Sequence, residues 1–235
     1  MIDDSIRPEL GVIGGLGPLA SADFYFKLTR MTPALRDEDH LPAVILSIPQ
    51  LPDRTEAILS GSDVLDAPLD AAISTLNALG VKYIAMPCNT VHHWYDRLAA
   101  LSKAEIIHIG DAVIADVRRH LSGGKVAILA TRGTLASGLY QDRLVAAGFA
   151  PAVDVTADFQ PDVDAAIHLV KAGAIEDAAA ATERAIRAAA EAGADAAILG
   201  CTELSVVAQS LKPTDLAIID SNAALARVCL ERCGY

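Results

Sequence analysis

Short apolar runs alternate along this chain with longer stretches of helical character, and this alternation limits the fold more than any other feature. Each run has the length and continuous apolar character of a strand buried on both faces, as the strands of parallel sheets are. The pattern therefore predicts an α/β fold of doubly wound parallel sheets flanked by helices. The runs are residues 10–13, 43–48, 82–86, 106–109, 126–130, 152–155, 196–199 and 217–219.

Two pairs of segments resemble each other at a spacing of about half the chain. Residues 17–21 and 133–137, each following an apolar run, lie 116 positions apart. Residues 80–90 and 193–202 form the second pair, in which Cys88 corresponds to Cys201, 113 positions away. The alternative is chance similarity in an alanine-rich sequence.

The repeat predicts two similar α/β halves. The first covers residues 1–107 and the second covers residues 108–214. The last segment, 215–235, is expected to return to the first half as a strand and a helix.

Charge and composition exclude several classes of protein. An apolar fraction of 52% with 21% charged residues is typical of a globular chain and excludes disorder. With 19 basic against 30 acidic residues and a net charge of −11, the chain has no basic field for nucleic acid. A binder of anions with this balance must gather a few cations at one place.

The beginning of the chain and its cysteines indicate where the protein works. The first ten residues, MIDDSIRPEL, contain no apolar run of the kind found in secretory signals, and no window approaches the length of a membrane span. We therefore expect a cytoplasmic protein with no membrane partner. In that compartment the four cysteines, at positions 88, 201, 229 and 233, are expected to be free thiols.

Cys88 and Cys201 each follow an apolar run, at the point where an α/β unit turns into its next helix and where open sheets bind ligands. The N-terminus of a helix favours anions, so this position is expected to lower the pKa of both thiols. The alternative is that each cysteine is a small buried apolar residue. Their equivalent placement in the two repeats favours a joint role.

Two halves that face each other would offer one thiol from each side of a cleft. Inversion of a carbon stereocentre needs this geometry, because a base removes a proton from one face while an acid returns one to the other. A Cys–His–acid hydrolase would leave the second cysteine unexplained. A dithiol redox pair is usually close in sequence, and these two residues are not.

Several motifs of the chain resemble those of the cofactor-independent aspartate/glutamate racemase superfamily, in particular its aspartate racemase branch. The resemblance covers nearly the whole chain. Glutamate racemases usually carry His where this chain has Glu203, which favours the aspartate branch, and Val91 replaces the more usual Ala. The motifs are PCNTVH (87–92), LGCTEL (199–204), GGLGP (14–18), RDEDH (36–40), PDRT (52–55), LATRGT (129–134) and SGLYQ (137–141).

The resemblance implies two flavodoxin-like halves related by a pseudo-twofold axis, with the site between them. It also implies amino-acid racemisation without pyridoxal phosphate or any other cofactor, and a homodimer. Cys88 and Cys201 would be the paired acid and base. Further matched residues are Asn89, Thr90 and Thr202, with help from Thr131, for the α-carboxylate, and Arg54 and Lys171 for the side-chain carboxylate.

The chemistry explains these residue types. Removal of an α-hydrogen leaves a carbanion whose charge spreads into the carboxylate, so fixed hydroxyls, amides and helix N–H groups are needed there. Glu203 is expected to bind either Cys201 or the substrate ammonium. Gly15 is expected either to let backbone approach a small substrate or to form a tight turn. His92 either tunes Cys88 or makes a structural hydrogen bond.

Other sites are less well supported. The segment 15–20 fits a dinucleotide-binding pattern formally, but Pro18 removes a phosphate-facing N–H. Cys229 and Cys233 share a helix face, yet two ligands do not make a zinc site, so no metal is expected.

The leading hypothesis is therefore an aspartate racemase, with glutamate as a second substrate candidate. The alternatives are a related isomerase, such as a hydantoin racemase or maleate isomerase, and a noncatalytic amino-acid-binding protein.

Overall fold

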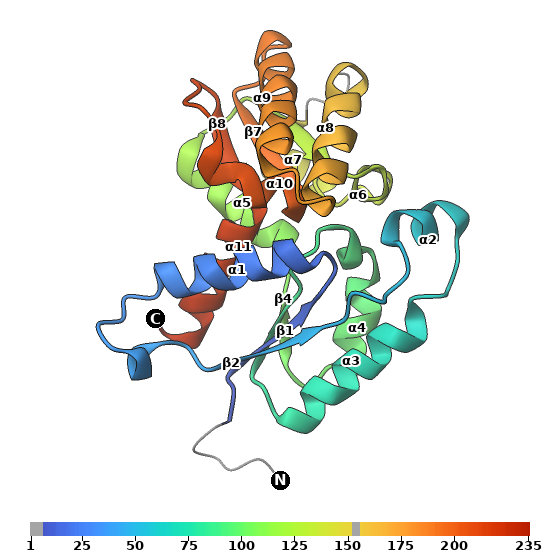
Figure 1. The fold of residues 1–235 in the computed structure, drawn as a ribbon, viewed down its shortest axis with the longest axis vertical. Helices are drawn as coiled ribbons and strands as arrows, with labels where there is room; N and C mark the ends of the chain where they lie inside the picture. The colour runs from blue at the N-terminus through green and yellow to red at the C-terminus, as the bar shows by residue number, and fades with distance from the viewer. Residues whose placement is uncertain (1–6, 152–155) are drawn as a thin grey trace.

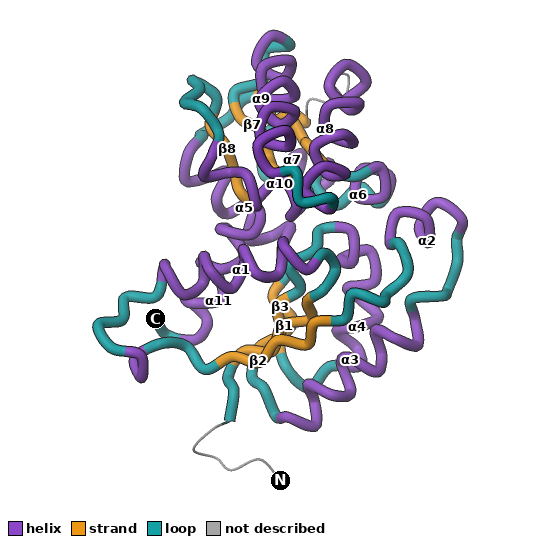
Figure 2. Tube along the Cα trace, viewed as in Figure 1, coloured by secondary structure: helices purple, strands orange, loops and turns teal. Residues whose placement is uncertain are grey.

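The computed structural model describes residues 7–151 and 156–235, which form two parallel four-stranded sheets (Figures 1 and 2). Each sheet has its first strand between its second and third, because the orders are β2-β1-β3-β4 and β6-β5-β7-β8. The two halves therefore repeat one topology, and the predicted fold class is confirmed. The strands are β1 Leu10–Gly14, β2 Ala43–Ser47, β3 Tyr83–Ala85, β4 Glu105–Ile107, β5 Lys125–Ala130, β6 Ala150–Pro151, β7 Ala196–Gly200 and β8 Ala217–Asp220.

The strands follow the apolar runs of the sequence closely. Every residue of the central strands β1 and β7 is buried, whereas the edge strands β2 and β8 are mostly half-buried. Parallel registers join them, with Leu10 opposite both Ala43 and Tyr83 in the first sheet. The run predicted at 152–155 lies outside the described residues, and β6 ends just before it.

Helices cover both faces of the two sheets. The helices are α1 Pro18–Met31, α2 Arg54–Ser60, α3 Asp66–Leu79, α4 Tyr95–Leu101, α5 Ile109–His120, α6 Arg132–Ala136, α7 Gln141–Ala146, α8 Thr156–Lys171, α9 Ile175–Glu191, α10 Thr202–Val207 and α11 Ser221–Cys233, with the short 3-10 helices η2 Asp37–Asp39, η3 Thr90–Trp94 and η4 Ala208–Ser210. Helix α3 packs on the outer face of the first sheet, and α8 and α9 pack on that of the second. Among the described residues, none of the helices combines the length and apolar character needed to cross a membrane.

One hydrophobic core joins the two halves. It combines side chains from both sheets, such as Val12 and Ile198, with Phe24 of α1, Val113 of α5 and Leu225 of α11. In Figure 1, α1 and α11 cross the middle of the molecule between the two sheets. The halves are therefore held together on this side by packed helices.

The prediction that the last segment returns to the first half as a strand is wrong. Strand β8 pairs with β7, with Ala217 opposite Ala196, so it extends the second sheet. A strand that follows the short helix α10 is placed beside β7 by an ordinary crossover between neighbouring parallel strands. The following helix, α11, packs against both α1 and α5. The division at residues 107 and 108 stays a prediction.

Candidate active site

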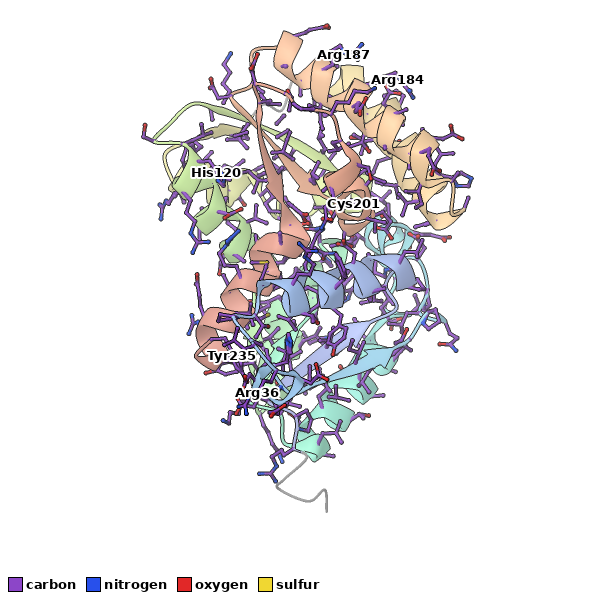
Figure 3. The ribbon with its side chains drawn as sticks, turned by 60° about the vertical axis from the view of Figure 1, so that its left-hand side comes forward. Arg36, His120, Arg184, Arg187, Cys201 and Tyr235 are labelled. Atoms are coloured by element: carbon purple, nitrogen blue, oxygen red, sulfur yellow. The ribbon has the colours of Figure 1, made fainter. Side chains whose placement is uncertain are left out.

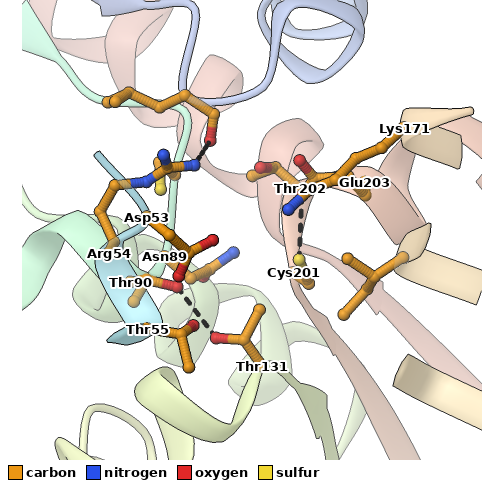
Figure 4. A pocket seen from close by; sticks show the side chains of 13 residues that line it. Asp53, Arg54, Thr55, Asn89, Thr90, Thr131, Lys171, Cys201, Thr202 and Glu203 are labelled. Carbon is orange, nitrogen blue, oxygen red and sulfur yellow. Dashed lines mark hydrogen bonds between the residues drawn. The ribbon is translucent and has the colours of Figure 1, made fainter. Parts of the chain in front are cut away.

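A pocket lies where the carboxyl ends of both sheets face each other. In Figure 3, Cys201 lies in the middle of the molecule, while Arg184 and Arg187 lie at its outer end. Figure 4 shows Arg54 and Thr90 on one wall and Cys201 and Glu203 on the other. The lining residues are Leu16, Asp53, Arg54, Thr55, Cys88, Asn89, Thr90, Thr131, Ile167, Lys171, Cys201, Thr202 and Glu203.

The pocket brings together almost all the site residues predicted from the sequence. Of the ten, the nine other than Gly15 line it. Gly15 instead forms the tight turn after β1, with φ +84°, and donates its N–H to Ser21 Oγ at 2.8 Å. A Cβ at this position would lie 2.3 Å from the backbone nitrogen of Ile48. The glycine is therefore required by backbone packing beside the pocket.

The cavity volume of the pocket is about 20 Å³, room for about one water molecule. An amino acid is several times larger, so the pocket must widen to admit one. Lys171, at the end of α8, is an exposed residue of the pocket lining.

The two pocket thiols are equally buried, with 5% of each residue exposed. Burial raises the pKa of Cys88, and the Glu203 carboxylate adds to this, although the Arg54 guanidinium and the backbone N–H of Val91 act in the opposite direction. Burial also raises the pKa of Cys201 well above its usual range, and the Glu203 carboxylate raises it further. The expectation that helix N-termini would lower both pKa values is wrong, because desolvation of the thiolates outweighs the nearby N–H groups.

The two thiols have neighbours of opposite charge. Cys201 Sγ donates to Glu203 Oε2 at 2.9 Å. Arg54 lines the pocket together with Cys88, and its positive charge acts to lower the pKa of this thiol. The Nη1 and Nη2 atoms of Arg54 donate to Pro52 O at 3.1 Å and Leu16 O at 2.9 Å. The resemblance implies only a substrate contact for this guanidinium, so its effect on Cys88 comes from the structure alone.

Three threonine hydroxyls meet between the halves at the edge of the pocket. Thr90 Oγ1 lies 2.9 Å from both Thr131 Oγ1 and Thr134 Oγ1, which lie 3.0 Å apart. Thr131 also caps α6 by accepting the N–H of Thr134 at 3.1 Å. Thr134 was missed from the sequence, although its place in the Thr-Arg-Gly-Thr turn after β5 was a usable signal.

Asn89 and Thr202 also make contacts across the halves. Asn89 Nδ2 donates to Ser221 Oγ at 3.1 Å, and its Oδ1 accepts from the hydroxyl of Tyr140. Thr202 Oγ1 donates to Pro87 O at 3.1 Å. These bonds fix the two loops that carry the thiols. Tyr140 and Ser221 had not been selected from the sequence as site residues.

His92 holds the loop that carries Cys88 in place through hydrogen bonds to the backbone. Its Nε2 accepts the N–H of Ile109 at 3.1 Å, so its Nδ1 carries the proton and donates to Cys88 O at 2.9 Å. Burial lowers the pKa of His92 to about 3, so the ring is neutral at physiological pH. These are structural hydrogen bonds to backbone, one of the two predicted alternatives. Across the described residues, no three His, Cys, Asp or Glu side chains gather in a way that would hold a metal ion.

Comparisons with known proteins show which family of sequences this chain resembles. The sequence model of the family described as Asp/Glu/Hydantoin racemase matches residues 13–229. The broad specificity amino-acid racemase RacX of Bacillus subtilis is 27% identical over 222 residues, which cover 93% of this chain and 95% of that protein.

Solved structures of similar proteins extend the comparison. The aspartate racemase of Picrophilus torridus superposes with a TM-score of 0.81 at 29% identity, covering 96% of this chain and 94% of that one. The glutamate racemase of Francisella tularensis in complex with D-glutamate has a TM-score of 0.70 at 16% identity, covering 97% and 81% of the two chains, and shares the fold.

Proposed function

The chain belongs to the Asp/Glu/hydantoin racemase family, and on this premise we propose that it interconverts L- and D-aspartate, with glutamate as a second substrate candidate. The reaction uses Cys88 and Cys201 as the two acid–base groups and needs no cofactor. The observation that carries the proposal is that corresponding thiols of the two halves line one pocket.

The pocket supplies what proton transfer at an α-carbon requires. One thiolate removes the α-hydrogen from one face, and the opposite thiol returns a proton to the other face. The negative charge that develops in the α-carboxylate is placed next to Thr90 and Thr131, whose hydroxyls already lie at hydrogen-bond distance from each other. Hydroxyls fixed before the reaction stabilise this charge without reorganising.

Charged side chains in the pocket fit an acidic amino acid. Arg54 and Lys171 supply positive charge for a second carboxylate, while Glu203 and Asp53 supply negative charge for the ammonium group. Aspartate and glutamate differ by one methylene, which a fitted pocket distinguishes by about 1 to 3 kcal/mol. The similarity to an aspartate racemase at 29% identity supports aspartate first, and the similarity to a broad specificity racemase makes a wider panel of amino acids worth testing.

Proton exchange tests the reaction directly. The protein is incubated with L-aspartate or L-glutamate in deuterated water, and deuterium at the α-carbon is followed together with optical rotation. We expect deuterium to enter as rotation is lost. A protein that only binds amino acids would instead show a higher melting temperature with ligand and no exchange.

Cysteine variants test the assignment of the two thiols. Cys88→Ser and Cys201→Ser are each expected to lower racemisation by about a thousandfold or more, since each removes one of the two proton-transfer groups. Cys229→Ser is the matched control, because Cys229 is a buried free thiol of α11 that does not line the pocket. Unchanged racemisation in either pocket variant would refute the two-base mechanism.

The resemblance to the family also supports a cytoplasmic homodimer. Light scattering on the purified chain measures its mass in solution, and a monomeric mass at working concentrations would refute the dimer. Fluorescent tagging in cells checks the compartment.

A further inference from the structure

Glu203 and Arg54 place opposite charges beside two thiols that are otherwise matched. Both cysteines follow a strand of a repeated half, and both are 5% exposed. Cys88 and the Arg54 guanidinium line the same pocket, whereas Cys201 donates to the Glu203 carboxylate at 2.9 Å. The repeat therefore gives the two thiols the same position but different electrostatic surroundings.

We propose that the thiol pair is polarised: Cys88 is the thiol that ionises first, beside Arg54, and Glu203 is a positioning residue that keeps the proton on Cys201. The active, singly ionised pair is then a Cys88 thiolate facing a Cys201 thiol. The catalytic meaning of this inference rests on the proposed racemase function, but the protonation order is a property of the protein without substrate.

Arg54 is a fixed positive charge. Two of its nitrogens donate to the backbone carbonyls of Pro52 and Leu16, and a guanidinium does not lose its proton in proteins. Its Nε is buried and has no hydrogen-bond partner within the described part of the chain. Burial raises the pKa of Cys88 and Glu203 raises it further, whereas Arg54 is the largest of the contributions that lower it. The cation therefore favours a thiolate at Cys88.

Glu203 lies between Cys201 and Gly17 on the other side of the pocket. Its Oε2 accepts the Cys201 thiol proton, and its Oε1 lies against Gly17, where a Cβ would be only 2.5 Å away. A carboxylate that accepts the proton of a thiol stabilises the thiol and repels the thiolate. In agreement, burial and Glu203 together raise the pKa of Cys201 well above its usual range.

The remaining charged groups around the thiols do not cancel this difference. Asp53 lines the pocket next to Arg54, but its side chain caps α2 by accepting the N–H of Glu56 at 3.0 Å. Lys171 reaches the pocket from the end of α8, where it is exposed. The Tyr140 hydroxyl donates to Asn89, and burial raises the pKa of this tyrosine, so it remains neutral.

The polarity has a mechanistic consequence. When the Cys88 thiolate takes the α-proton, the C–H bond breaks, an S–H bond forms and the electron pair stays on the α-carbon and its carboxylate. The S–H bond of Cys201 then breaks as its proton passes to the opposite face, which leaves a Cys201 thiolate beside Glu203. The free enzyme must next lose a proton from Cys88 and gain one at Cys201. Glu203 favours this return.

Alkylation of the substrate-free protein tests the order of ionisation. Iodoacetamide reacts with the thiolate, so the alkylation rate of each cysteine, measured by peptide mass spectrometry across pH, gives its midpoint. Equal exposure makes Cys88 and Cys201 comparable, and the partly exposed Cys233 serves as an internal control. We expect Cys88 to have the lower midpoint.

Three variants separate the contributions. Glu203→Gln keeps the size of the side chain but removes its charge, and should lower the Cys201 midpoint by about one to two pH units while moving that of Cys88 less. Arg54→Gln should raise the Cys88 midpoint by a similar amount. Gly17→Ala, which displaces the Glu203 carboxylate, should shift Cys201 in the same direction as Glu203→Gln. Circular dichroism checks that each variant is folded.

The proposed function and this inference fail in different ways. If Cys201 has the same midpoint as Cys88 or a lower one, or if Glu203→Gln moves both thiols equally, the polarised pair is refuted even when racemisation continues. If the midpoints are ordered as expected but no amino acid exchanges its α-proton, the racemase proposal fails and the protonation order stands. In an active enzyme, the ratio of kcat/KM for the two enantiomers stays at one, so the midpoints carry the test.

Discussion

Burial affects the pKa values of the two pocket thiols more than their positions near helix N-termini do. Both thiols are at helix N-termini, yet the pKa of each is raised because a buried thiolate loses its hydration. Specific neighbours, Arg54 and Glu203, then separate the two residues. A sequence motif reports the position of a thiol, but only the packed structure reports which charge lies beside it.

His92 gives a pH-dependent prediction at the same scale. Its pKa is lowered from its ordinary 6.5 to about 3 by burial, so between these values the unfolded chain binds more protons than the folded one. Stability is therefore full above about pH 6.5 and falls as the pH drops towards 3, by up to about 1.4 kcal/mol per pH unit from this residue. His108, whose pKa is lowered to about 4, acts in the same direction.

Replacing His92 by Gln should make the free energy of unfolding depend less on pH below about 6.5. Urea unfolding between about pH 5 and pH 8 measures the slope for the wild type, for His92→Gln and for the exposed control His168→Gln. A slope that is unchanged in His92→Gln and equal to that of the control would show that His92 does not cause the acid destabilisation.

The two cysteines could be predicted as site residues because they occupy the same position in a repeated pattern. Cys88 and Cys201 each follow a strand, so the sequence alone predicts that they lie at one site. Thr134, Tyr140 and Ser221 could not be predicted as site residues in this way. Their hydrogen bonds join segments far apart in the chain, and the sequence around a single polar residue does not indicate a distant partner.

At the scale of the elements, strands are well predicted because parallel sheets bury continuous apolar runs. Apart from the run at 152–155, which lies outside the described residues, the boundaries move by only one or two residues. Strand pairing is harder to predict. The run at 217–219 is a strand as expected, but its apolar character does not say which sheet it joins, and it lies beside β7. Helices α2 and α6 contact each other beside the pocket, where Arg54, Thr55 and Thr131 line it, and we call this region the mouth. No signal in either segment alone predicts this contact.

Gly133 makes this contact between α2 and α6 possible. A Cβ at position 133 would lie 2.9 Å from both Cα and Oγ1 of Thr55 and 3.1 Å from Cγ2 of Thr90. Because the nearest atoms include backbone, Gly133→Ala should hold the two halves apart at the mouth of the pocket. We expect kcat/KM to fall by about tenfold, equivalent to about 1.4 kcal/mol.

For Gly133→Ala, we expect that the free energy of unfolding does not fall together with kcat/KM. An alanine in a helix is about 0.5 to 1 kcal/mol more favourable than a glycine, so α6 itself gains from Gly133→Ala. Gly123→Ala, at a position with open space around it, is the control for activity. Full activity in Gly133→Ala would show that the halves need not approach so closely during catalysis.

At the scale of the whole molecule, the two halves meet along two regions with different character. The mouth, between α2 and α6, depends on close backbone contact, whereas the opposite side is a shared core crossed by α1 and α11 (Figure 1). With a cavity of only about 20 Å³, the pocket must widen for substrate to enter, and we expect the halves to separate locally. The natural site of opening is the mouth, because opening the core would expose apolar surface.

A buried ionic cluster reinforces the shared side. Lys27 of α1 pairs with Asp23 at 2.7 Å and with Asp220, at the end of β8, at 2.6 Å. It also donates to Ser205 O of α10 at 2.8 Å, so one side chain ties the first half to the second. Lys27→Met should cost about 3 kcal/mol, because it leaves two largely covered carboxylates, 11% and 15% exposed, without their cation.

The second substitution makes this prediction specific. In Lys27→Met/Asp220→Asn, one uncompensated charge is removed, and Asn222 Nδ2 still donates to Asp23 at 2.8 Å, so part of the lost stability should return. Chemical unfolding gives the free energy of unfolding of the wild type, Lys27→Met and the double variant. Arg36→Met is the control, since Arg36 pairs with Asp39 on the surface and such pairs are worth about 1 kcal/mol or less. Should Lys27→Met cost no more than Arg36→Met, the cluster does not join the halves, and the shared apolar core alone must hold them while the mouth opens.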